Sequence, residues 1–310
     1  MRTREVLRHL GIARSSWYAP APKPERARPG PKPKAVPGEL VEAITVAAQQ
    51  YPWWGYKRIA VVLRRQGVRV SNKQVWRVFK AEGLFQPKRK VRPAELYQAQ
   101  KLYELLPRGP NELWQADVTY IHIPGHGWWY AVTVIDYYSR YLLALHLTAS
   151  FSAVEVGFAV EQARAEAERL HGPFGKTPFL VTDNGSSFLA RRFQKQIQGQ
   201  FAHVRIRYRT PTQLGLLERF HQTLKQEEVY WQIYDSPAQA RESLAAFRQR
   251  YNNVRPHWAL LPESGGDVLT PADVYIQGQA TQLPRWQGWA KAAKQTLDEQ
   301  LQLQAMPKVA

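Results

Sequence analysis

Three acidic residues, distant from one another in the sequence, stand where carboxylate side chains could do chemistry. Asp117 lies in the middle of an apolar, β-rich run (WQADVTY, residues 114–120). Asp183 directly follows a second apolar run, FLVT, and Glu218 comes 35 positions later in a stretch typical of a helix. A carboxylate inside an apolar strand is costly to desolvate unless a cation offsets its charge.

Each acid taken alone has a structural explanation, which we favour for a single residue over a functional one. Asp117 could form a salt bridge within its strand, Asp183-Asn184-Gly185 has the composition of a turn, and Glu218 could be a surface charge. Taken together they are harder to dismiss. Hard divalent cations prefer carboxylate oxygens and keep positions open for water and phosphate. Carboxylates from two strands and a helix suit such a site.

The elements that must position these acids predict a mixed α/β sheet. Three β-rich, aromatic runs with short connections indicate an antiparallel meander of strands over residues 113–123, 128–135 and 141–147. The expected elements after them are a helix over 152–171, a strand over 179–182, a helix over 188–197, a strand over 204–206 and a long helix from about Thr212. Such an order places helices on the faces of the sheet. Asp183 then lies at the C-terminal end of a buried strand, where open α/β sheets place ligand groups.

A small helical domain is expected before the sheet. Ser71 precedes Gln74 by three residues, which is the spacing of a capping box, and it begins the third of three predicted helices. One face of this helix carries cations, namely Lys73, Arg77 and Lys80. Three helices with a basic last one are typical of a helix-turn-helix that places a helix in the DNA major groove. A solvated charged face is the alternative.

The net charge points to a polyanionic partner. Lys and Arg number 43 against 25 Asp and Glu, a formal net charge of +18, and residues 1–110 hold 23 of these bases and 7 of these acids. Such a surplus favours nucleic acid, because neutralised phosphates release counterions. A ribosomal-type or merely soluble basic protein is the alternative. The absence of cysteine excludes disulfides and thiol nucleophiles, and no apolar run suggests a membrane span, so we expect a soluble, cytoplasmic, nucleoid-associated protein.

Composition divides the chain into six parts. The expected parts are a helix-turn-helix fragment or plain helix at 1–18, with a turn at Gly11; a Pro-rich basic linker at 19–38; a helical domain at 39–87; a basic linker at 88–110 with a helix over 93–106; an α/β core at 111–278; and a helical tail at 279–310.

Several segments resemble one protein family. Residues 111–120 (NELWQADVTY) and 181–185 (VTDNG) resemble the first two motifs of the integrase-core transposases, and residues 218–220 (ERF) resemble the third. Residues 251–257 (YNNVRPH) are similar to the stretch that follows the core in transposases of bacterial insertion sequences. Residues 51–84 are similar to the helical domain that precedes it. The resemblance covers about residues 40–278.

This resemblance implies an RNase H-like fold, a triad of Asp117, Asp183 and Glu218, and Mg²⁺ or Mn²⁺, with two ions expected. One departure from the family pattern stands before the third motif. Such transposases commonly carry an Asn-Gly pair there, whereas this chain has Leu214-Gly215. The polar contacts leading into that helix are therefore in doubt, and a degenerate, inactive copy is an alternative.

Helical spacing extends the expected DNA interface. His221, Gln222 and Lys225 follow Glu218 on its own face, so this face is expected to present a cation and hydrogen-bonding groups to DNA. Pairing of Lys225 with Glu228 is the alternative. Three other expectations are that Arg58, in the segment GYKRI, contacts DNA, that the cluster Trp128-Trp129-Tyr130 lies in the core, and that His257 belongs to loop structure.

The expected function is that of a transposase. It would bind the double-stranded ends of a mobile element, cut them and join them to target DNA, with at least two copies of the chain on the DNA. The sequence does not determine whether the product of a partner reading frame also takes part. The alternatives are an RNase H-like nuclease and a catalytically inactive DNA-binding regulator.

Overall fold

The computed structural model describes residues 3–18, 35–86, 107–205 and 215–282, and the chain divides into two units, Met1–Gly38 and Glu39–Ala310. Several predicted parts of the chain lie mostly or wholly outside the described residues. They are the linkers expected at 19–38 and 88–110, the helix expected over 93–106, the beginning of the helix expected from Thr212 and the tail expected at 279–310. No helix in the described ranges is long and apolar enough to cross a membrane.

The first unit contains two short helices, α1 (Thr3–His9) and α2 (Arg14–Trp17). Gly11 between them has a φ of 66°, a left-handed conformation that favours glycine. Leu7 is the residue of α1 that is buried. The prediction of two helices around a glycine turn is confirmed.

A three-helix domain begins the second unit, with α3 (Gly38–Gln50), α4 (Tyr56–Arg65) and α5 (Asn72–Ala81). The capping box predicted for α5 is present, since the side chains of Ser71 and Gln74 each accept a bond from the other's backbone N–H. Apolar side chains from all three helices fill its interior, among them Ile44, Ile59 and Val75. The buried face of α5 packs into this hydrophobic core, and the opposite face of the helix stays exposed.

A five-stranded mixed sheet follows, in the order β3-β2-β1-β4-β5. Its strands are β1 (Leu113–Ile123), β2 (Gly127–Asp136), β3 (Leu142–Thr148), β4 (Phe179–Thr182) and β5 (Ala202–Arg205). The first three strands pair antiparallel as a meander, whereas β4 pairs parallel with β1 and with β5. This is an RNase H-like arrangement, and it confirms the predicted fold class.

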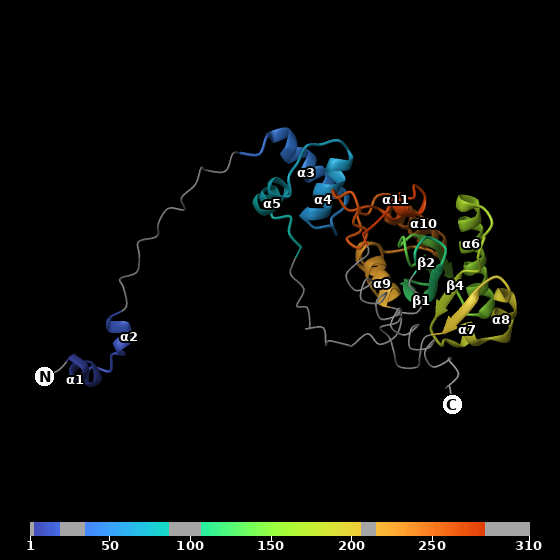
Figure 1. The fold of residues 1–310 in the computed structure, drawn as a ribbon, viewed down its shortest axis with the longest axis horizontal. Coiled ribbons are helices and arrows are strands. Elements are labelled where there is room, and N and C mark those ends of the chain that lie inside the picture. The colour runs from blue at the N-terminus through green and yellow to red at the C-terminus, as the bar shows by residue number, and fades with distance from the viewer. Residues whose placement is uncertain (1–2, 19–34, 87–106, 206–214, 283–310) are drawn as a thin grey trace, which may run out of the picture. The chain divides into compact units, whose positions relative to one another are not determined.

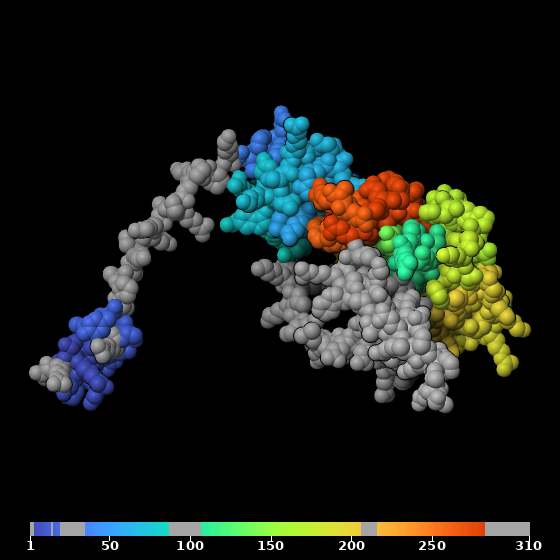
Figure 2. Space-filling view, in the orientation of Figure 1, coloured from blue at the N-terminus to red at the C-terminus, as the bar shows by residue number. Residues whose placement is uncertain are grey.

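Helices cover both faces of the sheet (Figure 1). One face packs on α6 (Ala153–His171), α7 (Ser186–Leu189) and α8 (Arg191–Ile197), and the other on α9 (Gly215–Glu227) and α10 (Pro237–Asn253). A short 3₁₀ helix, η3 (Val229–Trp231), follows α9, and α11 (Pro271–Tyr275) follows α10. The yellow-green surfaces of α6, α7 and α8 adjoin one another in the space-filling view (Figure 2).

Alternation along β1 assigns each side chain to one face. Trp114 and Ala116 join the core beneath α6, whereas Ile121 and Ile123 join the core beneath α9 and α10. Asp117 shares the parity of Ile121, so its side chain points toward α9. The sheet therefore brings the first of the three acids to the helix that carries the third.

The helix predicted over 188–197 is wrong as one element, because it is broken into α7 and α8. Ala190 between them is extended, with φ −60° and ψ 134°. Phe188 and Phe193 are both fully buried, yet residues five positions apart do not share one face of a continuous helix. The break lets both aromatic rings reach the core, and Gln194 Nε2 donates to the freed carbonyl of Phe188 at 2.6 Å.

Side chains of α10 occupy backbone groups of the edge strand β3. Asn252 Oδ1 accepts from the N–H of Leu142 at 2.8 Å, and Asn252 Nδ2 donates to the carbonyl of the same residue at 3.0 Å. Arg248 donates to this carbonyl as well, and Arg241 donates to the carbonyl of Leu147. Helix α10 therefore holds the edge of the sheet by hydrogen bonds as well as by apolar contact.

Candidate active site

Asp117 is held in the middle of the sheet by its strand. It lies opposite Thr133 of β2, and its side chain is 20% exposed. Burial raises the pKa of Asp117 to about 7; the N–H of Val118, which donates to Oδ1 at 2.8 Å, opposes the rise, and the charges of Asp183 and Glu218 add to it. Asp183 and Glu218 therefore lie near enough to act electrostatically on Asp117.

His221 supports Asp117 from α9. Its Nε2 lies 2.9 Å from Thr133 Oγ1, and its Nδ1 lies 3.7 Å from Asp117 Oδ2. Thr133 in turn donates its hydroxyl to the carbonyl of Asp117 at 3.2 Å. Burial, and then the charge of Lys225, lower the pKa of His221 to about 4, so the ring is neutral near pH 7. The expectation that His221 faces DNA is wrong, because its side chain is 12% exposed and packs against the sheet.

Asp183 is brought beside Asp117 by the parallel pairing of β4 with β1. Ala116 pairs with Thr182, so each aspartate comes one residue after a paired position, on strands spaced about 4.8 Å apart. The N–H of Gly185 donates to Asp183 Oδ1 at 2.9 Å. A Cβ added at Gly185 would lie 3.0 Å from that oxygen and 3.3 Å from the ring of Phe151. The turn therefore holds the carboxylate where a larger residue at 185 would crowd it.

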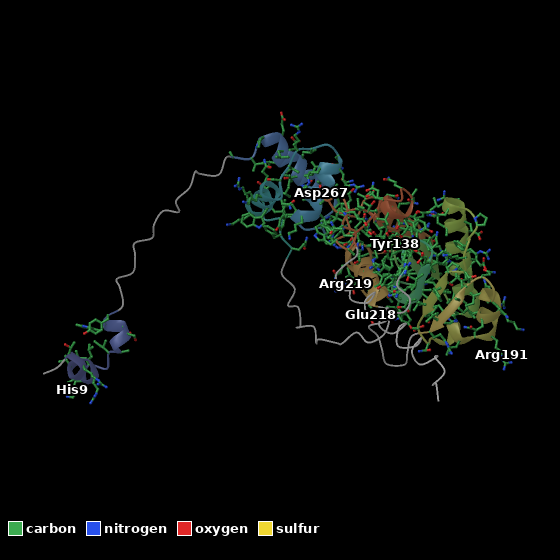
Figure 3. The ribbon with its side chains drawn as sticks, in the orientation of Figure 1. His9, Tyr138, Arg191, Glu218, Arg219 and Asp267 are labelled. Carbon is green, nitrogen blue, oxygen red and sulfur yellow. The ribbon has the colours of Figure 1, made fainter. Side chains whose placement is uncertain are left out.

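Glu218 lies in the first turn of α9 and is exposed together with Arg219 (Figure 3). The next turn of the helix carries His221, and Leu217 and Phe220 anchor the same stretch in the core beneath the sheet. The sequence thus places Glu218 toward solvent while Leu217 and Phe220 on either side of it are buried.

The three carboxylates do not form a ready-made metal site in this structure. Within residues 3–18, 35–86, 107–205 and 215–282, no three His, Asp or Glu side chains are close enough together to hold a metal ion. The donor chemistry nevertheless fits a hard divalent cation, because the pKa of Asp117 is raised in part by the negative charges of Asp183 and Glu218. A cation between these groups would relieve their repulsion.

The DNA-facing residues expected on α9 are accessible to different extents. Gln222 is exposed and Lys225 is half-buried. The alternative pairing of Lys225 with Glu228 is not found, because Glu228 accepts from Arg250 at 2.6 Å and also contacts Ser243. Their contact with DNA stays a prediction.

The cations expected on α5 lie along its outer side. Lys73 and Lys80 are exposed and Arg77 is half-buried. The ammonium of Lys80 lies 5.5 Å from the ring centre of Trp76, which is 42% exposed. An exposed tryptophan among cations is a feature that the sequence reasoning passed over, although its position between Lys73 and Arg77 could have drawn attention to it.

Arg58 lies in a different setting from the one expected. Its guanidinium contacts Glu227 at 3.7 Å and lies 5.6 Å from the ring centre of Trp258. Burial, and then the charge of Arg255, lower the pKa of Arg58 to about 10. Arg58 therefore contacts other residues of the protein. These contacts do not support its predicted contact with DNA, which stays a prediction.

The aromatic cluster expected in the core is split by strand alternation. Trp129 packs beneath the sheet against the second core, and Tyr130 stacks on Phe151 with ring centres 5.9 Å apart. Trp128 is 64% exposed, so its assignment to the core is wrong. It is the second residue of β2, next to Gly127, and its ring contacts that of His122 on β1. His257 does lie in a loop, as expected, with its N–H donating to the carbonyl of Leu269.

Family models match both folded parts of the second unit. Two models described as an integrase core domain match residues 107–211 and 200–261, and a model described as an HTH-like domain matches residues 38–92. Together the core matches contain all three acids.

Relatives of similar length come from bacterial insertion elements. The chain is 25% identical over 280 residues to an uncharacterized 31.7 kDa protein of insertion element IS407 of Burkholderia multivorans, covering 90% of this chain and 92% of that one. It is 26% identical over 203 residues to transposase InsF of insertion sequence IS3A of Escherichia coli, covering 62% and 67% of the two chains.

Among solved structures, the integrase catalytic core domain of HTLV-2, determined in complex with magnesium, aligns with 54% of this chain and 98% of its own. The sequence identity is 19% and the TM-score is 0.40. The sheet order and the pairing directions described above identify the fold independently of this alignment.

Proposed function

We propose that the chain, which matches models of the integrase core domain and is similar to insertion-element transposases, binds the ends of a mobile element and catalyses DNA cleavage and strand transfer with a divalent metal. The observation that carries the proposal is that the negative charges of Asp183 and Glu218 raise the pKa of Asp117, whose strand places it beside Asp183 and faces it toward the helix of Glu218. Carboxylates that repel one another are unfavourable unless a cation or a proton is taken up.

The proposed ligands are Asp117, Asp183 and Glu218, with Mg²⁺ or Mn²⁺ as the cation and two ions as the expected number. Bound there, such ions would supply activation of the attacking hydroxyl and stabilisation of the leaving oxygen in phosphoryl transfer. Cation binding would require the carboxylates to draw closer than they stand in this structure.

The surrounding residues have complementary proposed roles. Neutral His221 contacts Thr133 and borders Asp117, so it adds no positive charge of its own beside the acids. Gln222 and Lys225 would contact the DNA end beside Glu218, while Lys73, Arg77 and Lys80 would contact phosphates from the helical domain. Joining of two ends would require at least two copies of the chain.

A strand-transfer assay with duplexes that carry the element ends and Mn²⁺ tests this function. Joined products support a transposase, cleavage without joining supports a nuclease, and binding without products supports a regulator, for which the substitution at Leu214 is the motivating observation. Asp183→Asn should abolish joining while the affinity for ends stays within a few-fold. Normal joining by this variant would remove Asp183 from the site.

A further inference from the structure

Helix α9 ends on a second glutamate whose environment the proposed chemistry does not use. Glu227 is the last residue of α9, nine positions after Glu218 and about 13 Å further along the helix axis. Its side chain is 7% exposed. Buried carboxylates are costly unless they are paired, so its partners have to explain it.

Three residues bind the carboxylate group of Glu227. Arg255 binds both carboxylate oxygens, with Nε 2.9 Å from Oε2 and Nη2 2.8 Å from Oε1. Trp54 Nε1 donates to Oε2 at 3.0 Å, and Arg58 lies 3.7 Å from Oε1. Burial opposes ionisation of Glu227, but Arg255, Arg58 and the bond from Trp54 outweigh burial and lower its pKa. The carboxylate is therefore charged and held from three directions.

These partners belong to two other parts of the chain. Trp54 and Arg58 come from the helical domain, at the junction before α4 and in its first turn. Arg255 follows α10, within the motif YNNVRPH that the sequence singled out and that the proposed chemistry leaves without a role. Neighbouring contacts reinforce the junction, since Trp53 meets Trp231 edge-on and Arg250 lies over the ring of Trp53.

We propose that Glu227 is a positioning residue through which the helical domain fixes α9, and with it Glu218, relative to the sheet. The inference rests on the proposed function, because it gives the DNA-binding domain a mechanical link to a catalytic carboxylate. A helix is stiff along its axis, so a fixed C-terminal end restrains its first turn.

A second set of ion pairs provides the comparison. Arg64 binds Asp267 with two bonds of 2.6 Å, and Arg65 binds Asp273 at 2.7 Å. These pairs attach the same helical domain to the segment that follows α10, and none of the four residues belongs to α9. If the Glu227 junction served only to attach the domain, loss of either link would have the same effect.

The test compares Trp54→Phe with Asp267→Asn in the full-length protein. The indole ring of Trp54 stacks on Tyr51, and phenylalanine keeps an aromatic ring at this position. It removes the indole N–H that donates to Glu227. Amide hydrogen exchange in α9 should accelerate about tenfold in Trp54→Phe and stay unchanged in Asp267→Asn. The joining rate should fall about tenfold in the first variant alone, with the affinity of both variants for an element-end duplex within twofold of the wild type.

Unchanged exchange in α9 of Trp54→Phe, or equal changes in both variants, would overturn the proposal. Glu227→Gln provides a second variant, which keeps an acceptor for Trp54 but loses the charge that Arg255 and Arg58 require. It should accelerate exchange in α9 more than Trp54→Phe does. Because exchange is measured without substrate, it decides the positioning role even if the wild-type chain joins no DNA, an outcome that would instead remove the proposed function.

Discussion

The two ends of α9 carry the same residue type in opposite surroundings. Glu218 in the first turn is exposed, whereas Glu227 at the last position is buried and bound by Arg255, Arg58 and Trp54. Under the proposals above, the buried carboxylate anchors the helix and the exposed carboxylate stays available for a ligand. The first should matter for chemistry and the second for stability and position.

The largest expected effect is on chemistry at the exposed end. Glu218→Gln should lower the rate of strand transfer at least about a thousandfold, because it removes a proposed metal ligand. Its free energy of unfolding in urea should change by no more than about 0.5 kcal/mol, since the side chain is at the surface.

Glu242→Gln, an exposed glutamate of α10, is the matched control and should join DNA normally. A Glu218→Gln variant that joins as fast as the wild type would leave the exposed end of α9 without its proposed role.

At the buried end the expected effect is on folding. Glu227→Ala should lower the free energy of unfolding by about 3–5 kcal/mol, because it leaves Arg255 buried without its partner. Urea denaturation at neutral pH measures this, and Glu218→Ala in the same experiment should change it by no more than about 0.5 kcal/mol. Equal losses in the two variants would contradict the contrast between the ends.

The pH dependence of stability separates the charge of Glu227 from its shape. The folded pKa of Glu227 is lowered below 4.5, so its contribution is fully present above about pH 4.5 and is lost as the pH falls through the folded pKa. The difference in unfolding free energy between the wild type and Glu227→Gln should therefore be constant above that pH and shrink below it. A difference that stays constant as the pH falls below 4.5 would assign the effect to packing instead.

A smaller effect is expected at the turn that holds Asp183, which extends the comparison to a carboxylate on the sheet. Gly185→Ala should slow joining about tenfold, because its Cβ would displace an oxygen only 3.0 Å away. Gly175→Ala is the control, since a Cβ there meets nothing within 4 Å. Joining that is slowed equally in both variants would show that the turn does not position the acid.

The smallest effect is expected at α5, a helix of the helical domain that supplies none of the described partners of Glu227. Changing Arg77 and Lys80 to Gln should reduce the slope of log affinity against log salt by about 2, the loss of two phosphate contacts. Lys57→Gln, an exposed cation on α4, is the control. An unchanged slope in the double variant would remove α5 from the DNA interface.

Periodicity in the sequence was enough to predict the sheet and its covering helices, because alternation and turn residues are local signals. Local patterns also placed Asp117 on a strand and Asp183 at a strand end. The break at Ala190 was not predictable in this way, since it depends on both Phe188 and Phe193 reaching one core. Trp128 was misassigned because the sequence does not show where the covering helices end.

The junction at Glu227 was out of reach for a different reason. Its partner Trp54 lies 173 positions away and Arg255 lies 28 positions away, so no local pattern distinguishes Glu227 from the adjacent Glu228. Arg58 was expected to contact DNA as part of the segment GYKRI, and its contact with Glu227 through long-range packing could not be read from that segment.

The bonds from α10 to β3 limit how this protein can associate with others. A bare outer strand can recruit a strand from another chain and extend the sheet from molecule to molecule. Here Asn252 and Arg248 already occupy the backbone groups of Leu142. Addition of a foreign strand beside Leu142 would first have to displace these side chains, which protects this part of the edge strand against pairing with another chain.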